Sequence, residues 1–274
     1  MSARWIEVAD GVHVRRHEEL DLSLGLVVGD DACLVVDTGG DEAQGAEWAA
    51  AVRAVTPLPW TVVLTHAHFD HAFGTQAFLP CPVLAHPNCV DELVVEGAED
   101  KDKWAAHYDA QNQPEIAANI RATRIALPNT LVSERTAVDL GGRTVEIAQF
   151  GRGHTDHDLV LRVPDADVVF AGDLVENGAP PAFEGSFPAS WPTALAGLLD
   201  LTGPDTVVVP GHGEPVDAAF VAAQRAEIAA VVELTRALTA GSVTLEDVFR
   251  DSPFPAEATR RAIGRLTGRN RSAR

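Results

Sequence analysis

The sequence predicts a layered α/β sandwich, and two observations lead to this fold class. Short apolar runs typical of paired strands alternate with longer stretches that have the apolar spacing of helices. This arrangement occurs in two similar halves, and hairpins argue against an all-parallel sheet. The chain has 274 residues, of which 46% are hydrophobic, enough for a large core. We see no low-complexity linker and therefore expect one domain over 1–274, with about 215–274 as its helical C-terminal appendage.

The first half contains paired strands, a helix and two further strands. GLVVGDDACLVVDTGG is typical of two strands joined at the acidic turn GDD. Residues 41–55 have helical spacing, and Asp41 is a favourable N-cap. The β-branched run at 61–64 and the segment CPVLAHPN each predict a strand. We expect 88–125 to be mostly helical, with a break at Pro114.

The second half repeats the pattern of hairpins and helices. TAVDLGGRTVEIAQF predicts a hairpin that turns at Gly141 and Gly142, and DLVLRVPDADVVFAGD predicts another. WPTALAGLLDL predicts a helix and DTVVVP a last buried strand. Residues 215–240 form the longest helical pattern, followed by shorter helices at about 243–250 and 255–267. We expect the terminal GRNRSAR to be a frayed basic tail.

The composition argues against several classes of protein. The formal net charge is −19, so we expect no nucleic-acid binding through a basic face and no adhesion to anionic membranes. No apolar run has the length of a signal peptide or a membrane span. Cys33, Cys81 and Cys89 form no C-x-x-C pair and leave an odd count, which favours a reducing cytoplasm. We do not expect these cysteines to bind metal.

The stretch TVVLTHAHFDHAFG carries four ligand-type residues close together: His66, His68, Asp70 and His71. Side chains at i and i+2 of an extended segment point to one side, so His66 and His68 can converge on one ion. The turn that follows can bring Asp70 and His71 to a second point nearby. Imidazole and carboxylate groups suit zinc, and also iron or manganese.

A residue of a type that binds metal ions also follows the C-terminal end of five apolar strands, usually beside a glycine. These residues are Asp37 after ACLVV, His66 after VVLT, His154 after VEIAQFGRG, Asp173 after DVVFAG and His212 after DTVVVPG. Glycine allows a sharp turn and a close approach of the backbone to an ion. If the strand ends share one edge of the sandwich, five histidines and two aspartates surround a pair of metal ions.

The motifs HAHFDH, GRGHT, FAGD and VPGHG, in this order and at these spacings, resemble those of the metallo-β-lactamase-fold metallohydrolases. The resemblance covers roughly residues 5–215. It implies a four-layer αββα sandwich with C-terminal helices. Asp173 stands where one branch of true β-lactamases has a cysteine ligand, so the chain is more similar to the glyoxalase-II-like branch of zinc hydrolases, which has a bridging aspartate.

The resemblance further implies a ligand set for two divalent metal ions. It assigns the first ion to His66, His68 and His154, the second to Asp70, His71 and His212, and the bridge between them to Asp173, with a shared water or hydroxide as nucleophile. Asp37 matches a family position that usually supports a ligand from behind, with a plain turn residue at the end of the strand as the alternative. Asp70 is also the candidate catalytic residue, because its carboxylate can orient the water and pass a proton to the leaving group.

Two segments beside the motifs call for separate expectations. HTDHDLV departs from the Thr-x-Gly pattern of several family branches, and we expect its His157 to lie at the surface or behind the ligands. LVENGAPPAFEGSFPASW follows Asp173 directly and is rich in proline, glycine and aromatic residues. We expect Phe183, Phe187 and Trp191 to form an apolar wall for the substrate, with plain packing under the loop as the alternative.

The leading prediction is a cytoplasmic dinuclear hydrolase that acts on a small ester, lactone, thioester or amide. Zinc fits the ligand set best, with iron or manganese as alternatives. A second hypothesis is a mononuclear non-haem iron persulfide dioxygenase on the same fold, with iron at His66, His154 and Asp173. A third is a non-catalytic binding protein, against which the complete ligand set argues. The expected partner is a small molecule; its identity, the native metal and the oligomeric state stay open.

Overall fold

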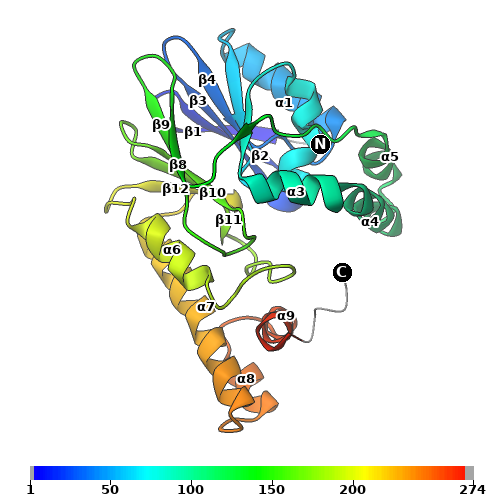
Figure 1. Ribbon diagram of the computed structural model, residues 1–274, viewed down its shortest axis with the longest axis vertical. Coiled ribbons are helices and arrows are strands. Elements are labelled where there is room, and N and C mark those ends of the chain that lie inside the picture. Colours follow the sequence, from blue (N-terminus) through cyan, green and yellow to red (C-terminus); the bar gives the residue numbers. More distant parts are fainter. Residues whose placement is uncertain (1–2, 269–274) are drawn as a thin grey trace.

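The computed structural model describes residues 3–268, in which the strands form two sheets (Figure 1). The larger sheet has seven strands in the order β1-β2-β3-β4-β5-β6-β7. Their bounds are β1 Ala3–Ala9, β2 Val12–His17, β3 Ser23–Val28, β4 Cys33–Val36, β5 Trp60–Val63, β6 Val83–Ala85 and β7 Thr130–Leu131. Pairing is antiparallel from β1 to β4 and parallel from β4 to β7, so the carboxyl ends of β4, β5 and β6 lie at one edge.

The smaller sheet has five strands in the order β12-β11-β10-β9-β8. Their bounds are β8 Arg135–Asp139, β9 Thr144–Gln149, β10 Leu159–Val163, β11 Val168–Glu176 and β12 Val207–His212. Both predicted hairpins are confirmed as β8–β9 and β10–β11, and β12 adds to β11 in parallel. Gly141 and Gly142 both have positive φ, of 77° and 67°, as a tight hairpin turn requires.

Helices cover the outer face of each sheet. Those on the larger sheet are α1 Glu42–Val55, α3 Pro87–Val95, α4 Gly97–Ala110 and α5 Pro114–Ala122. The helices on the smaller sheet are α6 Trp191–Leu199 and the first part of α7 Ala218–Thr239, while α8 Leu245–Asp251 and α9 Ala256–Thr267 pack on α7. The Asp41 side chain accepts a hydrogen bond from the Gln44 amide at 2.8 Å, which confirms the predicted N-cap of α1. The predicted break at Pro114 is confirmed, since α5 begins there.

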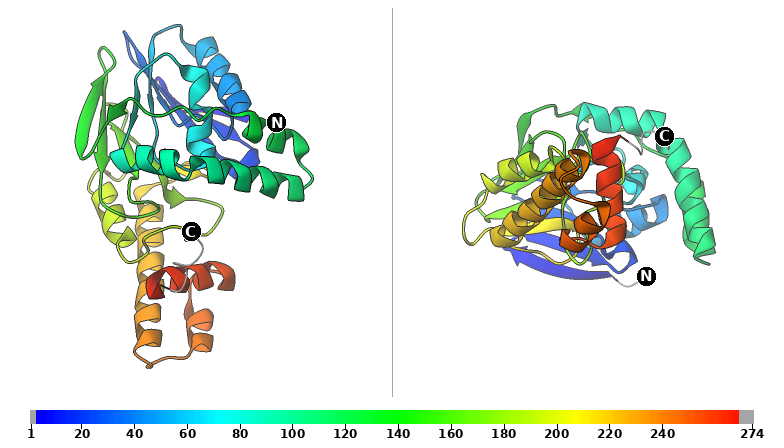
Figure 2. Two further views of the ribbon diagram at one scale, coloured as in Figure 1. Left: turned by 45° about the vertical axis from the view of Figure 1, so that its right-hand side comes forward. Right: turned by 90° about the horizontal axis from the view of Figure 1, so that it is seen from below.

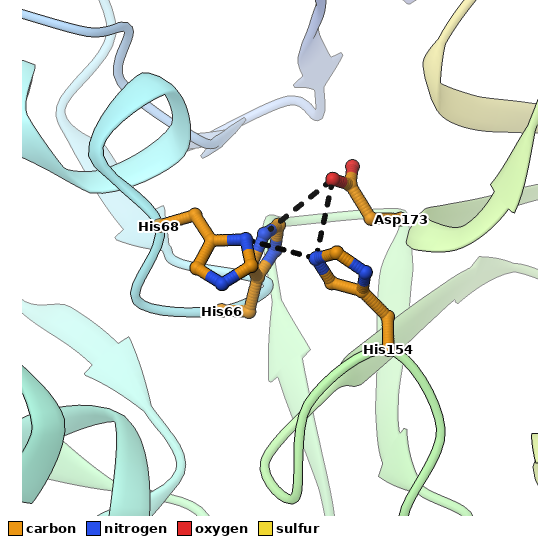
Figure 3. A group of neighbouring side chains, drawn as sticks. All are labelled: His66, His68, His154 and Asp173. Atoms are coloured by element: carbon orange, nitrogen blue, oxygen red, sulfur yellow. Dashed lines mark hydrogen bonds and ion pairs between the residues drawn. The ribbon is translucent and has the colours of Figure 1, made fainter. Parts of the chain in front are cut away.

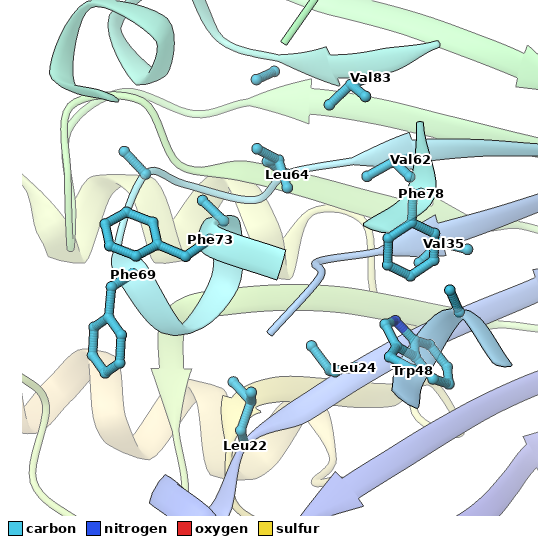
Figure 4. Close-up of a cluster of buried hydrophobic side chains, with 14 of the residues drawn as sticks. Leu22, Leu24, Val35, Trp48, Val62, Leu64, Phe69, Phe73, Phe78 and Val83 are labelled. Carbon is cyan, nitrogen blue, oxygen red and sulfur yellow. The ribbon is translucent and has the colours of Figure 1, made fainter. Parts of the chain in front are cut away.

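Three hydrophobic cores separate the four layers, so the predicted αββα sandwich is confirmed. Val62 and Leu64 lie in the core between the larger sheet and its helices, beside Trp48 of α1 (Figure 4). Val63 points the other way, into the core between the two sheets. A third core lies between the smaller sheet and α6, α7 and α9. A strand segment buried on both faces must be apolar at every position, and this explains the apolar run at 62–64, whereas Thr61 before it is only half-buried.

The long helix α7 carries the chain away from the sheets, and α8 and α9 fold back against it (Figure 2). Arg265 of α9 donates to the carbonyl oxygens of Gly185 and Ser186, each at 2.7 Å. The C-terminal helices therefore hold the loop that follows β11. The predicted frayed tail falls on 269–274 and lies outside the described residues.

Several of the described elements have no counterpart among the predicted ones, including β1, β2, α2 Phe69–Ala72 and η2 Phe73–Phe78. β1 and β2 were not predicted because charged residues interrupt their apolar pattern, and β1 is a half-exposed edge strand. The segment after His68 was expected to turn, and it forms the short helix α2 and the 3₁₀ helix η2. Within 3–268, every helix is too short or too polar to cross a lipid bilayer.

Candidate metal centre

Four side chains from three segments converge at one edge of the sandwich (Figure 3). His66 and His68 follow β5, His154 lies in the loop after β9, and Asp173 belongs to β11. One ligand atom from each lies within 4.8 Å of those from the other three. The His68 Nδ1 and His154 Nε2 atoms are 2.9 Å apart, and Asp173 Oδ2 is 3.4 Å from His154 Nε2 and 3.6 Å from His66 Nε2.

A second group of three forms beside the first. Asp70 and His71 lie on α2, and His212 ends β12; their ligand atoms also lie within 4.8 Å of one another. His212 Nε2 is 3.3 Å from both Asp70 Oδ2 and His71 Nε2. The short helix accounts for the separation of the two groups, because it turns Asp70 and His71 away from the extended His66–His68 pair.

The Asp173 carboxylate lies between the two groups. Besides its contacts to the first group, its Oδ1 is 3.1 Å from His71 Nε2 and its Oδ2 is 3.4 Å from His212 Nε2. Gly211 makes room for this carboxylate, since a Cβ there would lie 1.8 Å from Asp173 Oδ1. One carboxylate thus faces both groups, as a bridging ligand must.

The residues of the first group fit a divalent cation. His66 is 0% exposed, and its Nε2 has no hydrogen-bond partner, which is costly for a buried polar atom unless it serves as a ligand. Burial lowers the pKa of His66 well below its usual value and that of His154 to about 3, which leaves both rings neutral. A neutral imidazole is the form that binds metal.

In the second group, the carboxylates and the histidines shift one another's pKa values in opposite directions. Burial lowers the pKa of His71, but the carboxylates of Asp173, Asp70 and Asp37 outweigh burial and raise that pKa well above its usual value. Burial raises the pKa of Asp173, and the cations of His71 and His212 reverse that effect and hold it well below the normal range. A metal ion at this group would therefore compete with protons for the imidazole nitrogens.

Two hydrogen bonds orient the histidines of the second group from behind. Asp37 Oδ2 lies 2.8 Å from His71 Nδ1, while Asp37 Oδ1 accepts from the Thr65 amide at 2.7 Å. His212 Nδ1 donates to the Leu20 carbonyl at 2.7 Å. Both rings consequently present Nε2 to the centre, the arrangement that outer hydrogen bonds commonly impose on metal-binding histidines.

The aromatic residues expected to form a substrate wall lie in two environments. Phe183 and Trp191 are buried in the core beneath the loop, with the Trp191 ring 5.8 Å from that of His154. Phe187 is partly exposed, and the guanidinium groups of Arg152 and Arg265 lie 5.1 and 5.7 Å from its ring centroid. Large apolar side chains in a glycine- and proline-rich loop pack inward when a core lies below them. Phe187 therefore remains the exposed candidate of the three.

Glu176 is a buried carboxyl near the centre that sequence reasoning missed. It is 7% exposed, and its Oε1 accepts from the Ala182 amide at 3.0 Å. Burial and the negative charge of Asp173 raise its pKa to about 8. The available signal was a glutamate at the end of an otherwise apolar buried strand, VVFAGDLVE.

Comparisons with known proteins agree with this fold and site. The family model described as the metallo-beta-lactamase superfamily matches residues 23–212, which include all seven residues of the two groups. The chain belongs to this superfamily. It therefore belongs to a family of metallo-hydrolases and carries a histidine and aspartate cluster suited to divalent metal.

Curated relatives within the superfamily have different named activities. The probable metallo-hydrolase YqgX of Bacillus subtilis is 29% identical over 70% of this chain and 84% of its own length. The metallo-beta-lactamase type 2 of Bacillus cereus is 26% identical over 71% and 68%. The acyl-coenzyme A thioesterase MBLAC2 of Gallus gallus is 26% identical over 57% of this chain, and the match spans only 58% of that protein.

Solved structures of the superfamily share the fold at low identity. A metallo-beta-lactamase from Pontibacter korlensis superposes with a TM-score of 0.64 at 19% identity, over 83% of this chain and 99% of that one. A double mutant of the sec-alkyl sulfatase PisA1 gives a TM-score of 0.75 at 17% identity, over 97% of this chain and 50% of that one. The likeness shows a common architecture.

Removal of metal is expected to lower the melting temperature. Ligands from five segments meet only in the folded chain, so bound metal stabilises that state. An ion at about a hundred times its Kd contributes ~2.7 kcal/mol, and at ~2–4 °C per kcal/mol for a chain of this size the shift is roughly 5–10 °C. Differential scanning fluorimetry with EDTA, then with zinc, measures it. An unchanged curve after confirmed metal loss contradicts the coupling, and magnesium serves as the control ion.

Proposed function

We propose that the protein is a dinuclear, zinc-dependent hydrolase that cleaves a small carbonyl substrate such as an ester, lactone, thioester or amide. The observation that carries this proposal is the position of the Asp173 carboxylate between two groups of ligand-type side chains, 3.4 Å from His154 on one side and 3.1 Å from His71 on the other. Nitrogen and oxygen donors of this kind suit zinc. Two ions held by such donors would supply an activated water and a polarised carbonyl oxygen, which are the requirements of hydrolysis.

The chain's own residues have distinct roles in this proposal. His66, His68 and His154 would hold one ion, Asp70, His71 and His212 the other, and Asp173 both. Bound divalent cations lower the pKa of water toward neutrality and polarise the carbonyl oxygen. Asp70 can accept a proton from the attacking water and deliver it to the leaving group, since its carboxylate belongs to the centre and is 7% exposed.

The hollow beside Asp70 is small and mixed in character, so the proposed substrate class rests on the relatives. Its volume is about 10 Å³, and its lining combines the apolar side chains of Leu20, Leu22, Phe69, Ile116 and Ile120 with the polar or charged ones of Glu19, Asp41, Gln44 and Tyr108. The relatives named as an acyl-coenzyme A thioesterase and a metallo-beta-lactamase favour carbonyl chemistry over phosphoryl transfer.

Metal stoichiometry tests the proposal. Protein purified without added metal is expected to contain about two zinc ions per chain, as a two-metal hydrolase requires. A single iron, with oxygen uptake on a persulfide, would instead identify the mononuclear dioxygenase. Metal-free protein that binds no zinc on titration and turns over no substrate would leave the non-catalytic binding protein.

His212→Ala separates the two enzymatic functions. His212 contacts Asp70 and His71, so its loss should reduce bound metal from about two ions toward one and slow hydrolysis by on the order of a hundredfold or more. An iron enzyme centred on His66, His154 and Asp173 would keep its iron and lose only about tenfold in oxygen uptake. The exposed His107 provides a matched control, because His107→Ala removes an imidazole far from the ligands in sequence and should change neither quantity.

A further inference from the structure

His157 is a fully buried histidine that the proposed chemistry does not use. It is 0% exposed and stands where the sequence departs from the family pattern. Its Nε2 lies 3.1 Å from the amide nitrogen of Ala67, the residue between the ligand candidates His66 and His68. Its Nδ1 lies 3.0 Å from Asp156 Oδ1. The side chain therefore contacts the backbone of residues 66–71, the segment that we call the metal loop because it carries four candidate ligands.

The two contacts fix which nitrogen of His157 carries the proton. The Ala67 amide can only donate, so Nε2 of His157 must accept. In the neutral ring the proton then sits on Nδ1 and is donated to the Asp156 carboxylate. Asp156 thus holds the ring in the one tautomer that can receive the Ala67 amide.

This contact lies beside a backbone hydrogen bond that joins the ends of two strands from different sheets. The Leu159 amide donates to the Thr65 carbonyl at 2.8 Å, at the start of β10. Two residues further along the metal loop, the Ala67 amide meets an imidazole nitrogen rather than a backbone carbonyl. A side-chain acceptor leaves the backbone free to turn, and here it keeps residues 65–67 aligned while the chain bends into α2.

The same short segment also fixes the third histidine of the first group. Asp158 is buried, and its carboxylate accepts from the Thr155 amide at 2.9 Å and from the Thr155 hydroxyl at 2.6 Å. Thr155 directly follows His154. Residues 153–158 thereby hold His154 on one side and, through His157, the segment that carries His66 and His68 on the other.

We propose that His157 is a positioning residue for the first metal group, acting through the Ala67 amide to set the distance between His66 and His68. This inference rests on the proposed metal centre. It assigns a role to the first group alone, because the contacts of the second group run through Asp37 and the Leu20 carbonyl instead. Loss of His157 should consequently weaken one site and spare the other.

Two substitutions of His157 distinguish positioning from bulk packing. His157→Leu fills the space but leaves the buried Ala67 amide without an acceptor, whereas His157→Gln places an amide oxygen near the position of Nε2. Calorimetric titration of apo-protein with zinc should show a 10- to 100-fold loss of affinity at one site in His157→Leu, with the other unchanged. His157→Gln should recover most of that loss.

Hydrogen exchange in the apo-protein provides a readout that is independent of metal. The Ala67 amide should exchange faster in His157→Leu than in wild type or His157→Gln, while the Thr65 and Leu159 amides keep their rates. Asp156→Ala, a change at a partly exposed residue, should produce the same pattern with a smaller loss, and it replaces His157→Leu if that variant does not fold.

Each outcome bears on a different statement. Wild-type protein that binds no zinc overturns the proposed metal centre itself. Wild type that binds two ions, with His157→Leu indistinguishable from it, overturns the role of His157 and leaves the centre intact. Equal weakening at both sites, or failure of His157→Gln to recover affinity, shows a general loss of packing and also overturns the inference.

Discussion

Replacement of Asp173 by alanine is expected to abolish turnover and to deplete the centre of metal. The Asp173 carboxylate lies within 3.6 Å of nitrogen atoms from His66, His154, His71 and His212, so its loss removes a donor from both groups at once. It also removes the negative charge that two cations need at close range. We expect kcat/KM to fall by roughly a thousandfold or more.

Elemental analysis and a panel of chromogenic esters, lactones and thioesters measure both quantities on the same preparation. Asp165→Ala provides the control, since Asp165 is an exposed carboxylate paired with Arg143. Asp173→Asn keeps one oxygen donor and should retain more metal than the alanine variant. Full metal content with near-wild-type turnover in Asp173→Ala would remove Asp173 from the centre.

Asp70→Asn is expected to separate metal binding from catalysis. Asparagine keeps an oxygen donor near His212, 3.3 Å away in the native protein, so most of the metal should remain. The amide cannot accept a proton, and general acid–base catalysis typically contributes 10²- to 10⁴-fold. We therefore expect kcat to fall by about that factor, with a much smaller change in KM.

Asp70→Ala is the matched comparison, because it removes the donor as well and should lose metal in addition to activity. The informative measurement is turnover at equal metal occupancy for wild type and both variants. Turnover of Asp70→Asn within a few-fold of wild type, at full occupancy, would show that the proton is carried by another group.

The fold could be predicted wherever burial leaves a periodic signal in the sequence. Residues 62–64 are apolar throughout and lie in the cores on either face of the larger sheet, and the helix at 41–55 has both spacing and an N-cap. β1 gave no such signal, because an edge strand needs only one apolar face and Arg4 and Glu7 interrupt its pattern. Strand order and the packing of α9 on α7 depend on tertiary contacts that a local pattern does not encode.

The candidate ligands could be found from sequence because each one has a diagnostic residue type at the end of a strand. The groups that hold these ligands in place could not be found in this way. The Leu20 carbonyl that orients His212 is a backbone group, and any residue could supply it. The contact between His157 and Ala67 joins residues 90 positions apart and depends on how the two sheets pack, next to the hydrogen bond from the Leu159 amide to the Thr65 carbonyl. Such partners become visible only once the packing of the two sheets is known.

The loop after β11 has a support that the strand ends lack, and this has an evolutionary consequence. The candidate metal-binding side chains are positioned by two sheets that share a core, whereas the loop that carries Phe187 is held by Arg265 of α9 as well as by the Gly153 carbonyl, which accepts from the Phe187 amide at 2.8 Å. A lineage can therefore exchange the loop together with its helical support while the reactive centre is inherited unchanged. Descendants of one ancestral scaffold can in this way acquire new substrates by small steps, each of which leaves a working catalyst for selection to act on.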